Sequence, residues 1–235
     1  MLRGQIVLLL LDIDGTLLRE GATPVGQAMS AALKEVHGVE THGIRTRIET
    51  SGRTHGEIAR AILLDAGVPA QRIDALAGRV RDRCCEWSAR LVGADLSDAV
   101  LPGVRELLEW LASQAGVKLG LLTGNYEAIA RLKVTRAGLG EFFAPAIGAF
   151  GSDAEDRMAL PAIARQRAGT AGAPYPRADT IVIGDTPLDI ACARADGVRC
   201  MAVASGAFGV DALLGADAVA PDAVELRLAL RSLQG

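Results

Sequence analysis

The chain has 235 residues, of which 50% are hydrophobic and 23% charged, and its formal net charge is −3 at pH 7. This length and composition predict a packed globular protein, either one large domain or a core domain that carries a smaller one. Only 3% of the residues are aromatic. Few aromatic side chains and a negative net charge argue against general affinity for nucleic acid or an anionic membrane, because both are bound by basic surfaces. We therefore expect neither as a partner.

The cysteines and the N-terminal residues favour a cytoplasmic location. The chain has four cysteines, which are Cys84, Cys85, Cys192 and Cys200. They include no CxxC pair, so we expect reduced thiols and no zinc site. The apolar run near the N-terminus stops at Asp12, which makes it too short for a signal peptide. No stretch approaches the roughly 18 apolar residues that a transmembrane helix needs.

The first predicted element is a strand over residues 6–11, where six apolar residues follow one another without alternation. Such a run is typical of a parallel strand that is buried on both faces. It ends directly before Asp12 and Asp14. In open α/β sheets the ligand site lies at the carboxyl ends of the strands, so the sequence predicts that these two acids face a substrate.

The next part of the chain, residues 19–97, predicts an all-helical insertion. Met29, Leu33 and Val36 recur at helical spacing, and residues 73–91 predict a longer helix. From residue 98 onward, predicted strands alternate with helices. These strands cover residues 117–122, 146–150, 180–183, 198–204 and 218–219.

The alternation indicates an α/β protein with a doubly wound parallel sheet. We expect residues 1–18 and 98–235 to form this α/β core domain, with residues 19–97 as a smaller helical domain.

Polar residues follow three of the predicted strands. Asp12 and Asp14 follow the first, Thr123 and its neighbours follow the second, and Asp185 and Asp189 follow a later one. Carboxylates that converge at one sheet edge repel each other unless a cation lies between them. An oxygen-rich cluster of this kind suits Mg²⁺, which binds carboxylates together with substrate phosphates. The helix after Thr123 can also point free N–H groups at an anion.

Three segments with these acids resemble the motifs of the haloacid dehalogenase superfamily of phosphohydrolases. They are DIDGT at residues 12–16, LTGN at 122–125 and GDTPLD at 184–189. The helical insertion after the first motif resembles the cap of the phosphoglycolate phosphatase and β-phosphoglucomutase subgroup. The resemblance implies a Rossmann-like core and a helical cap that selects the substrate.

The resemblance also implies roles for the motif residues. Asp12 would attack phosphorus and form an aspartyl-phosphate. Asp14 would protonate the leaving oxygen and then activate water. Mg²⁺ would be bound by Asp12, by the backbone carbonyl of Asp14 and by Asp185, with Asp189 as a direct or water-mediated ligand. The phosphoryl oxygens would be bound by Thr123, Gly124 and Asn125.

One motif departs from the family pattern. The family usually has a lysine shortly before the acidic last motif, but no lysine lies between Gly138 and Asp185 in this chain. Arg157 occupies the comparable place, and a guanidinium can pair with phosphate and carboxylate. We therefore assign this catalytic and phosphate-binding role to Arg157. Lys133 is the alternative, but its predicted helix leads it away from the site, to a distance of roughly 15 Å.

The start of the second predicted helix, at residues 49–55, resembles a cap loop that meets the active site. Arg53 is the residue that we expect to bind an anionic end of the substrate, with Arg45 and Arg47 as weaker candidates. Ser51 or Thr54 is expected to cap the helix. For His55 we expect a surface or capping role.

These features predict a Mg²⁺-dependent phosphatase that hydrolyses a small phosphorylated metabolite similar to phosphoglycolate. Two alternatives stay open at this point. One is a phosphomutase of the same fold, and the other is a non-catalytic relative that acts through protein contacts. We expect a monomer or a homodimer.

Overall fold

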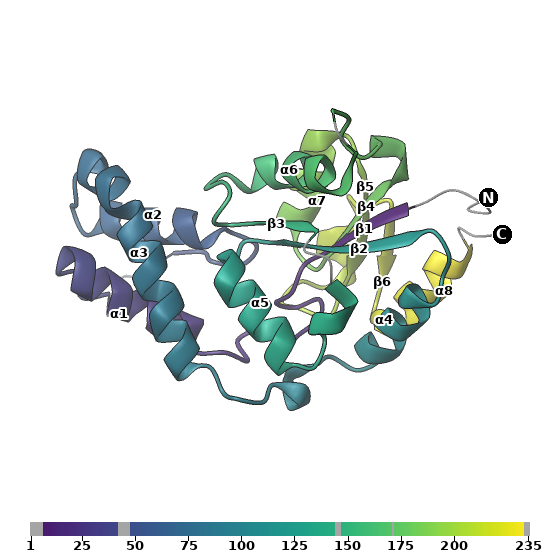
Figure 1. The fold of residues 1–235 in the computed structure, drawn as a ribbon, viewed down its shortest axis with the longest axis horizontal. Helices are drawn as coiled ribbons and strands as arrows, with labels where there is room; N and C mark the ends of the chain where they lie inside the picture. The colour runs from purple at the N-terminus through teal and green to yellow at the C-terminus, as the bar shows by residue number, and fades with distance from the viewer. Residues whose placement is uncertain (1–6, 42–47, 144–146, 171, 233–235) are drawn as a thin grey trace.

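A six-stranded parallel sheet with the strand order β3-β2-β1-β4-β5-β6 forms the centre of the molecule (Figure 1). This computed structural model describes residues 7–41, 48–143, 147–170 and 172–232. The chain order of the strands reverses between β1 and β4, which is where ligands bind in sheets of this type. The strands are β1 (Val7–Leu11), β2 (Val117–Thr123), β3 (Gly148–Phe150), β4 (Thr180–Gly184), β5 (Arg199–Val203) and β6 (Ala218–Ala220).

Helices cover both faces of the sheet, which explains why the residues of β1 are apolar without alternation. Leu9 and Leu11 pack into the core beneath α4, α5 and α8, whereas Leu8 and Leu10 pack into the core beneath α6 and α7. Figure 1 shows these two groups of helices on opposite sides of the sheet. The helices are α4 (Val104–Ala112), α5 (Glu127–Arg136), α6 (Leu160–Ala168), α7 (Pro187–Asp196) and α8 (Ala223–Ser232). The predicted doubly wound α/β fold is therefore confirmed.

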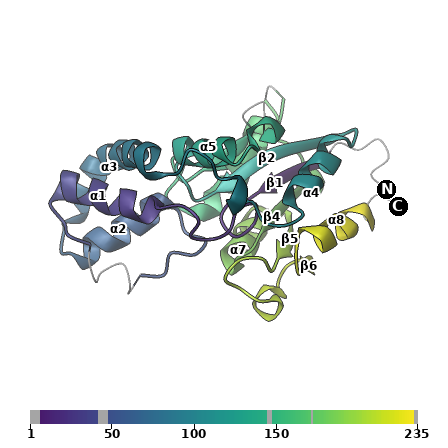
Figure 2. The same ribbon diagram turned by 90° about the horizontal axis from the view of Figure 1, so that it is seen from below.

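Three helices form an insertion between β1 and α4, beside the sheet (Figure 2). They are α1 (Val25–His37), α2 (His55–Asp65) and α3 (Ala70–Leu91). Met29, Leu33 and Val36, which share one face of α1, are buried. Their spacing of three and four residues explains why this sequence forms an amphipathic helix. The helical insertion is thus confirmed, while the division into two domains at residues 18–19 and 97–98 stays a prediction.

Polar contacts join the insertion to the rest of the molecule. Arg136 of α5 donates to the backbone oxygen of Val92, directly after α3, over 2.6 Å. The hydroxyl of Thr54, before α2, donates to the backbone oxygen of Glu155 over 2.6 Å. Arg60 of α2 donates to the Glu155 carboxylate over 2.9 Å. These contacts hold the insertion against the carboxyl edge of the sheet.

The remaining boundaries differ little from the predictions. The predicted strand at residues 146–150 is observed as Gly148–Phe150, and residue 146 lies outside the described residues. The predicted helix at 73–91 begins earlier, at Ala70, because Pro69 precedes its first turn. Short 3₁₀ turns occur at Ser97–Ala99, Gly140–Phe143, Arg157–Ala159, Arg177–Asp179 and Val210–Leu213. Across the described ranges, no helix combines the length and the apolar character that crossing a membrane requires.

Candidate active site

A cavity of about 280 Å³ lies between the carboxyl edge of the sheet and the helical insertion. The α/β core lines it with polar and charged residues, among which are Asp12, Asp14, Thr123, Gly124, Asn125, Lys133, Arg157 and Asp185. The insertion and the chain that leads into it line the opposite side, with residues that include Glu20, Val25, Met29, Ser51, Arg53, His55 and Ile58. The cavity therefore brings the acids of the sheet edge together with the loop before α2.

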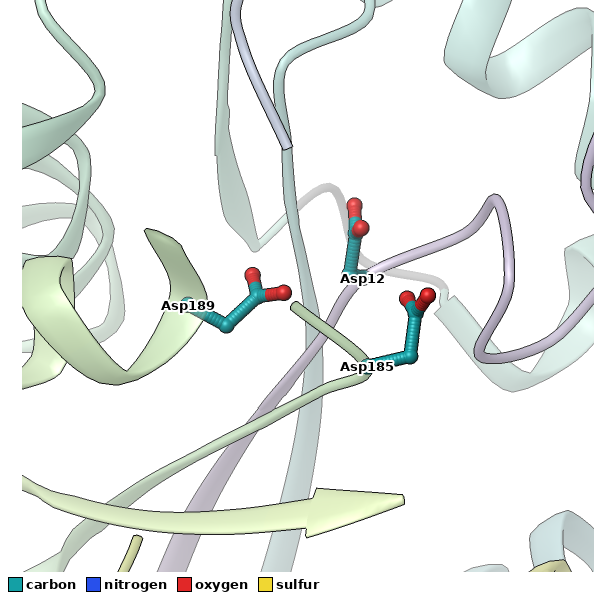
Figure 3. Close-up of side chains that lie close together, drawn as sticks. All are labelled: Asp12, Asp185 and Asp189. Carbon is teal, nitrogen blue, oxygen red and sulfur yellow. The ribbon is translucent and has the colours of Figure 1, made fainter. Parts of the chain in front are cut away.

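Three buried carboxylates converge at one end of the cavity (Figure 3). Asp12 follows β1, Asp185 follows β4, and Asp189 belongs to the first turn of α7. One oxygen of each lies within 4.8 Å of the others, and the three residues are 5%, 1% and 0% exposed. Because parallel strands end at the same sheet edge, acids at distant sequence positions become neighbours here.

The local sequence around α7 fixes the position of Asp189. Thr186 is the N-cap of α7, and its hydroxyl accepts a hydrogen bond from the Asp189 backbone N–H over 3.3 Å. In return, Oδ2 of Asp189 accepts from the Thr186 backbone N–H over 3.0 Å, which completes a capping box. A Cβ atom at Gly184 would lie 2.2 Å from Cγ of Asp189. Glycine is therefore required there for Asp189 to reach the cluster.

Burial and mutual repulsion raise the pKa values of two of these acids. The pKa of Asp12 rises to about 7, chiefly because the carboxyl group is buried, and Arg157 opposes this rise only in part. The pKa of Asp185 rises to about 8, because of burial and then because of the neighbouring Asp12 and Asp189. Oδ1 of Asp12 has no hydrogen-bond partner among the residues that the structure describes. A cation at this position would lower both pKa values and would give Oδ1 of Asp12 a partner.

The charges and donor atoms of the cluster fit one divalent cation. Three ionised carboxylates (−3) and the adjacent Arg157 (+1) give a net charge of −2. All the ligand atoms are oxygens, as Mg²⁺ and similar hard cations require. Both oxygens of Asp189 already accept hydrogen bonds, Oδ1 from Arg157 and Oδ2 from Thr186. The carboxylate oxygens of Asp12 and Asp185 have fewer hydrogen-bond partners, so they are more available to a metal.

Arg157 reaches the carboxylate cluster, in the place that the sequence predicts. It begins the 3₁₀ turn before α6 and is 3% exposed. Its Nη2 atom donates to Oδ1 of Asp189 and lies 3.5 Å from Oδ2 of Asp12. The guanidinium thus neutralises part of the charge beside Asp12 and holds Asp189 in place.

The expectation that Lys133 lies far from the site is wrong. Its Nζ atom lies 2.6 Å from Oδ2 and 2.8 Å from Oδ1 of Asp14, and 2.9 Å from Oδ1 of Asn125. Lys133 is the seventh residue of α5, so the helical rise carries it only about 9 Å beyond Glu127. Helical side chains lean toward the N-terminus of the helix, and the long lysine side chain therefore returns to the cavity.

Asp14 lies apart from the carboxylate cluster and is paired with Lys133. Burial raises its pKa, but the Lys133 ammonium and a hydrogen bond from Asn125 outweigh this, so the pKa falls below its usual range. The Asn125 amide nitrogen donates to Oδ2 of Asp14 over 2.8 Å and to the Thr123 hydroxyl over 2.8 Å. The side chain of Asp14 is thus held by Lys133 and Asn125 and does not belong to the cluster of Asp12, Asp185 and Asp189.

The loop at residues 123–125, called the phosphate loop below, touches the helical insertion directly. The backbone oxygen of Gly124 accepts a hydrogen bond from the His55 backbone N–H over 2.8 Å. A Cβ atom at Gly124 would lie only 2.2 Å from the backbone oxygen of Arg53. The insertion can therefore approach this closely only because residue 124 is glycine.

The segment before α2 places several predicted residues at the cavity. Thr54 is the N-cap of α2, since its hydroxyl accepts from the Glu57 backbone N–H over 3.1 Å. Arg53 lines the cavity, and its Nη1 atom lies 3.1 Å from Oε1 of Glu57. Ser51 donates instead to Glu20, over 3.2 Å. The candidates Arg45 and Arg47 lie outside the described residues.

The prediction of a surface or capping role missed the contacts of His55. This residue lines the cavity, and the edge of its ring packs against Tyr126. The residues around His55 predict the start of a helix, but they do not show which group the imidazole faces.

Comparison with known proteins relates this chain to one family of hydrolases. The model of the haloacid dehalogenase-like hydrolase family matches residues 6–197. Phosphoglycolate phosphatase from Pseudomonas fluorescens is 26% identical over 206 residues, which cover 85% of this chain and 70% of that protein. Phosphoglycolate phosphatase from Pseudomonas syringae pv. tomato is 29% identical over 199 residues, with the same coverage. The structure of a candidate β-phosphoglucomutase from Bacteroides vulgatus has a TM-score of 0.65 at 20% identity, covering 98% of this chain and 89% of that one.

Substitution of Gly124 by alanine is expected to separate the phosphate loop from the insertion. The added methyl group would overlap the backbone oxygen of Arg53, so the hydrogen bond from the His55 backbone to Gly124 should break. We expect faster deuterium exchange in peptides that contain His55, with an unchanged circular dichroism spectrum. Gly209→Ala is the control, because no atom lies within 4 Å of the added carbon. Unchanged exchange in Gly124→Ala would show that this contact does not hold the insertion in place.

Proposed function

The chain belongs to the haloacid dehalogenase-like hydrolase family, and we propose that it is a Mg²⁺-dependent phosphatase for a small phosphorylated metabolite. The observation that carries the proposal is the arrangement of the buried acids. Asp12, Asp185 and Asp189 form a cluster that fits a divalent cation, while Lys133 and Asn125 hold Asp14 apart from it. A phosphatase that forms an aspartyl-phosphate needs this separation, because one acid attacks phosphorus and another transfers protons.

Asp12 is the proposed nucleophile. One of its carboxylate oxygens would form a bond to phosphorus while the bond from phosphorus to the leaving oxygen breaks. The buried Oδ1 atom, which has no partner among the described residues, is available for this attack or for the metal. Mg²⁺, bound by Asp12, Asp185 and the backbone carbonyl of Asp14, would supply the positive charge that lets two anions approach. Both oxygens of Asp189 already accept hydrogen bonds from the protein, which favours a water-mediated or orienting role for that residue.

Asp14 is the proposed proton carrier. It would give a proton to the leaving oxygen, and its carboxylate would then take a proton from the water that attacks the aspartyl-phosphate. Water attack releases inorganic phosphate and restores Asp12. The lowered pKa of Asp14 favours the carboxylate needed for the second step. A bound phosphoryl dianion would compete for the Lys133 ammonium, which would weaken the interaction that lowers this pKa.

Arg157 and Lys133 would share the role that the family assigns to one lysine. Arg157 lies beside Asp12 and Asp189, so its charge acts on the nucleophile and the metal site. Lys133 lies beside Asp14 and Asn125, so its charge acts on the proton carrier and the phosphate loop. Thr123, Gly124 and Asn125 would bind the phosphoryl oxygens from that side. Negative charge that develops on the phosphoryl group would thus meet fixed positive groups on two sides.

The proposed substrate is a small phosphate ester with an anionic end, similar to phosphoglycolate. Arg53 lines the cavity from the insertion, and its partner Glu57 belongs to a half-exposed pair. Such pairs contribute little free energy, so the guanidinium can exchange this partner for a substrate carboxylate. The two Pseudomonas relatives named phosphoglycolate phosphatase support this substrate class.

Replacement of Asp12 by asparagine tests the proposed chemistry directly. The variant keeps the shape of the side chain and removes the nucleophilic carboxylate, so phosphate release with Mg²⁺ should fall by at least about a thousandfold. Asp82→Asn, on the exposed side of α3, is the matched control and should keep full activity.

A chelator should abolish the wild-type activity, and added Mg²⁺ should restore it. Unchanged activity in Asp12→Asn would refute the mechanism, and conversion of a hexose 1-phosphate without phosphate release would favour a mutase.

Replacement of Lys133 by methionine tests the role of this ammonium group. Loss of the charge beside Asp14 and Asn125 should lower kcat by roughly ten- to a thousandfold, as loss of a group that stabilises transition-state charge does. Because Lys133 lowers the pKa of Asp14, the limb of the pH–rate profile that reports Asp14 should move to higher pH. Lys118→Met is the control, since that lysine donates to the backbone oxygen of Ala168, away from the cavity. Wild-type kcat in Lys133→Met would contradict the shared role.

A further inference from the structure

His55 belongs to the helical insertion, but the α/β core determines where its ring lies. Its backbone N–H donates to the Gly124 oxygen over 2.8 Å. Its ring meets the Tyr126 ring edge-on, with centroids 5.1 Å apart and planes at 83°. The residue lines the same cavity as Asp14 and Lys133. The imidazole is thus held beside the loop at residues 123–125, on the wall of the cavity that the helical insertion contributes.

The hydrogen bonding of the ring indicates which nitrogen carries the proton. The backbone N–H of Tyr126 donates to Nδ1 of His55 over 3.3 Å. An imidazole nitrogen that accepts a hydrogen bond carries no proton, so in the neutral ring the proton is on Nε2. Burial, together with the nearby Lys133 ammonium, lowers the pKa of His55 to about 3, and Asp14 opposes this only in part. The ring is therefore neutral at physiological pH, with Nε2 as a donor.

The Nε2–H group is available to a ligand. No residue in the described part of the chain is hydrogen-bonded to Nε2 of His55, whereas Nδ1 and the backbone N–H both have partners. The fields of Asp14 and Lys133 both act on the imidazole, which places it near the acid that would protonate the leaving oxygen. In the proposed reaction, the atoms of the leaving group that follow the ester oxygen would lie beside this acid and therefore within reach of the imidazole.

We propose that His55 is a specificity-determining residue that donates a hydrogen bond from Nε2 to an oxygen on the leaving group of the substrate. The inference rests on the phosphatase function proposed above. It selects esters that carry a hydroxyl, carbonyl or carboxylate oxygen on the carbon next to the ester carbon. Arg53 would favour an anionic group, whereas the neutral Nε2–H can donate to a charged or an uncharged oxygen. His55 is partly buried, so an ester with a methyl group at that position would cover the N–H without replacing its hydrogen bond to water.

The test compares two esters that differ by one group. In 2-hydroxyethyl phosphate the second carbon carries a hydroxyl, and in propyl phosphate a methyl group of similar size replaces it. The wild-type protein with Mg²⁺ should prefer the hydroxyl ester by roughly ten- to a hundredfold in kcat/KM, the usual discrimination by a buried polar group. His55→Phe, which keeps the ring and removes both nitrogens, should bring this ratio close to one. His55→Asn, whose carbonyl can still accept from the Tyr126 N–H but whose shorter amide does not reach the position of Nε2, should do the same.

Two further variants separate recognition from structural support. His55→Gln places an amide N–H near the position of Nε2, so it should retain much of the preference even if Phe or Asn destabilises the fold. His37→Phe, at the end of α1 and away from the cavity, is the matched control and should leave the ratio unchanged. A ratio near one in the wild-type protein, or an equal loss on both esters in every His55 variant, would overturn the inference while the phosphatase function stands. Failure of the wild-type protein to release phosphate from any ester, p-nitrophenyl phosphate included, would overturn both.

Discussion

Repulsion between buried carboxylates is the constraint on which the rest of this structure depends. Asp12, Asp185 and Asp189 lie within 4.8 Å of one another, and almost no solvent reaches them. Burial of like charges at this spacing costs free energy unless positive charge is nearby. Arg157 supplies one positive charge, the capping box of α7 fixes one acid, and the remaining charge of −2 fits a divalent cation. The sheet holds these groups together because β1 and β4 are adjacent and end at the same edge.

A second pair of charges, Asp14 with Lys133, lies on the other side of the proposed phosphoryl position. Two acids of the same short motif thus have different environments, with a raised pKa for Asp12 and a lowered pKa for Asp14. A divalent cation would favour the carboxylate form of Asp12 that attacks phosphorus, whereas the lowered pKa of Asp14 favours the carboxylate that would take a proton from water. The helical insertion completes the cavity through contacts between Arg53, His55 and Gly124. The insertion therefore lies directly against the loop that is proposed to bind phosphate.

Most of the site follows from the sequence, and the exceptions have identifiable causes. Asp12, Thr123 and Asp185 each follow a buried apolar strand, so the topology of a parallel sheet is enough to bring them together. The rise along a helix predicts a distant Lys133, but helical side chains lean toward the N-terminus of their helix, and the ammonium group therefore returns to the cavity. Lys133 shares the buried face of α5 with Ile129 and Ala130, and a lysine at an apolar position is a signal of a buried partner. For His55 no such signal exists, because its partners Gly124 and Tyr126 come from a distant part of the chain.

The proposed mechanism requires that Asp12 becomes phosphorylated during turnover. The most direct measurement is to quench the reacting wild-type protein in acid, reduce it with borohydride and map the product by peptide mass spectrometry. Reduction converts an aspartyl-phosphate to homoserine, which unreacted aspartate does not form. We predict homoserine at position 12, only when both substrate and Mg²⁺ are present. Steady phosphate release without homoserine at position 12, or with homoserine at another aspartate, would contradict this account.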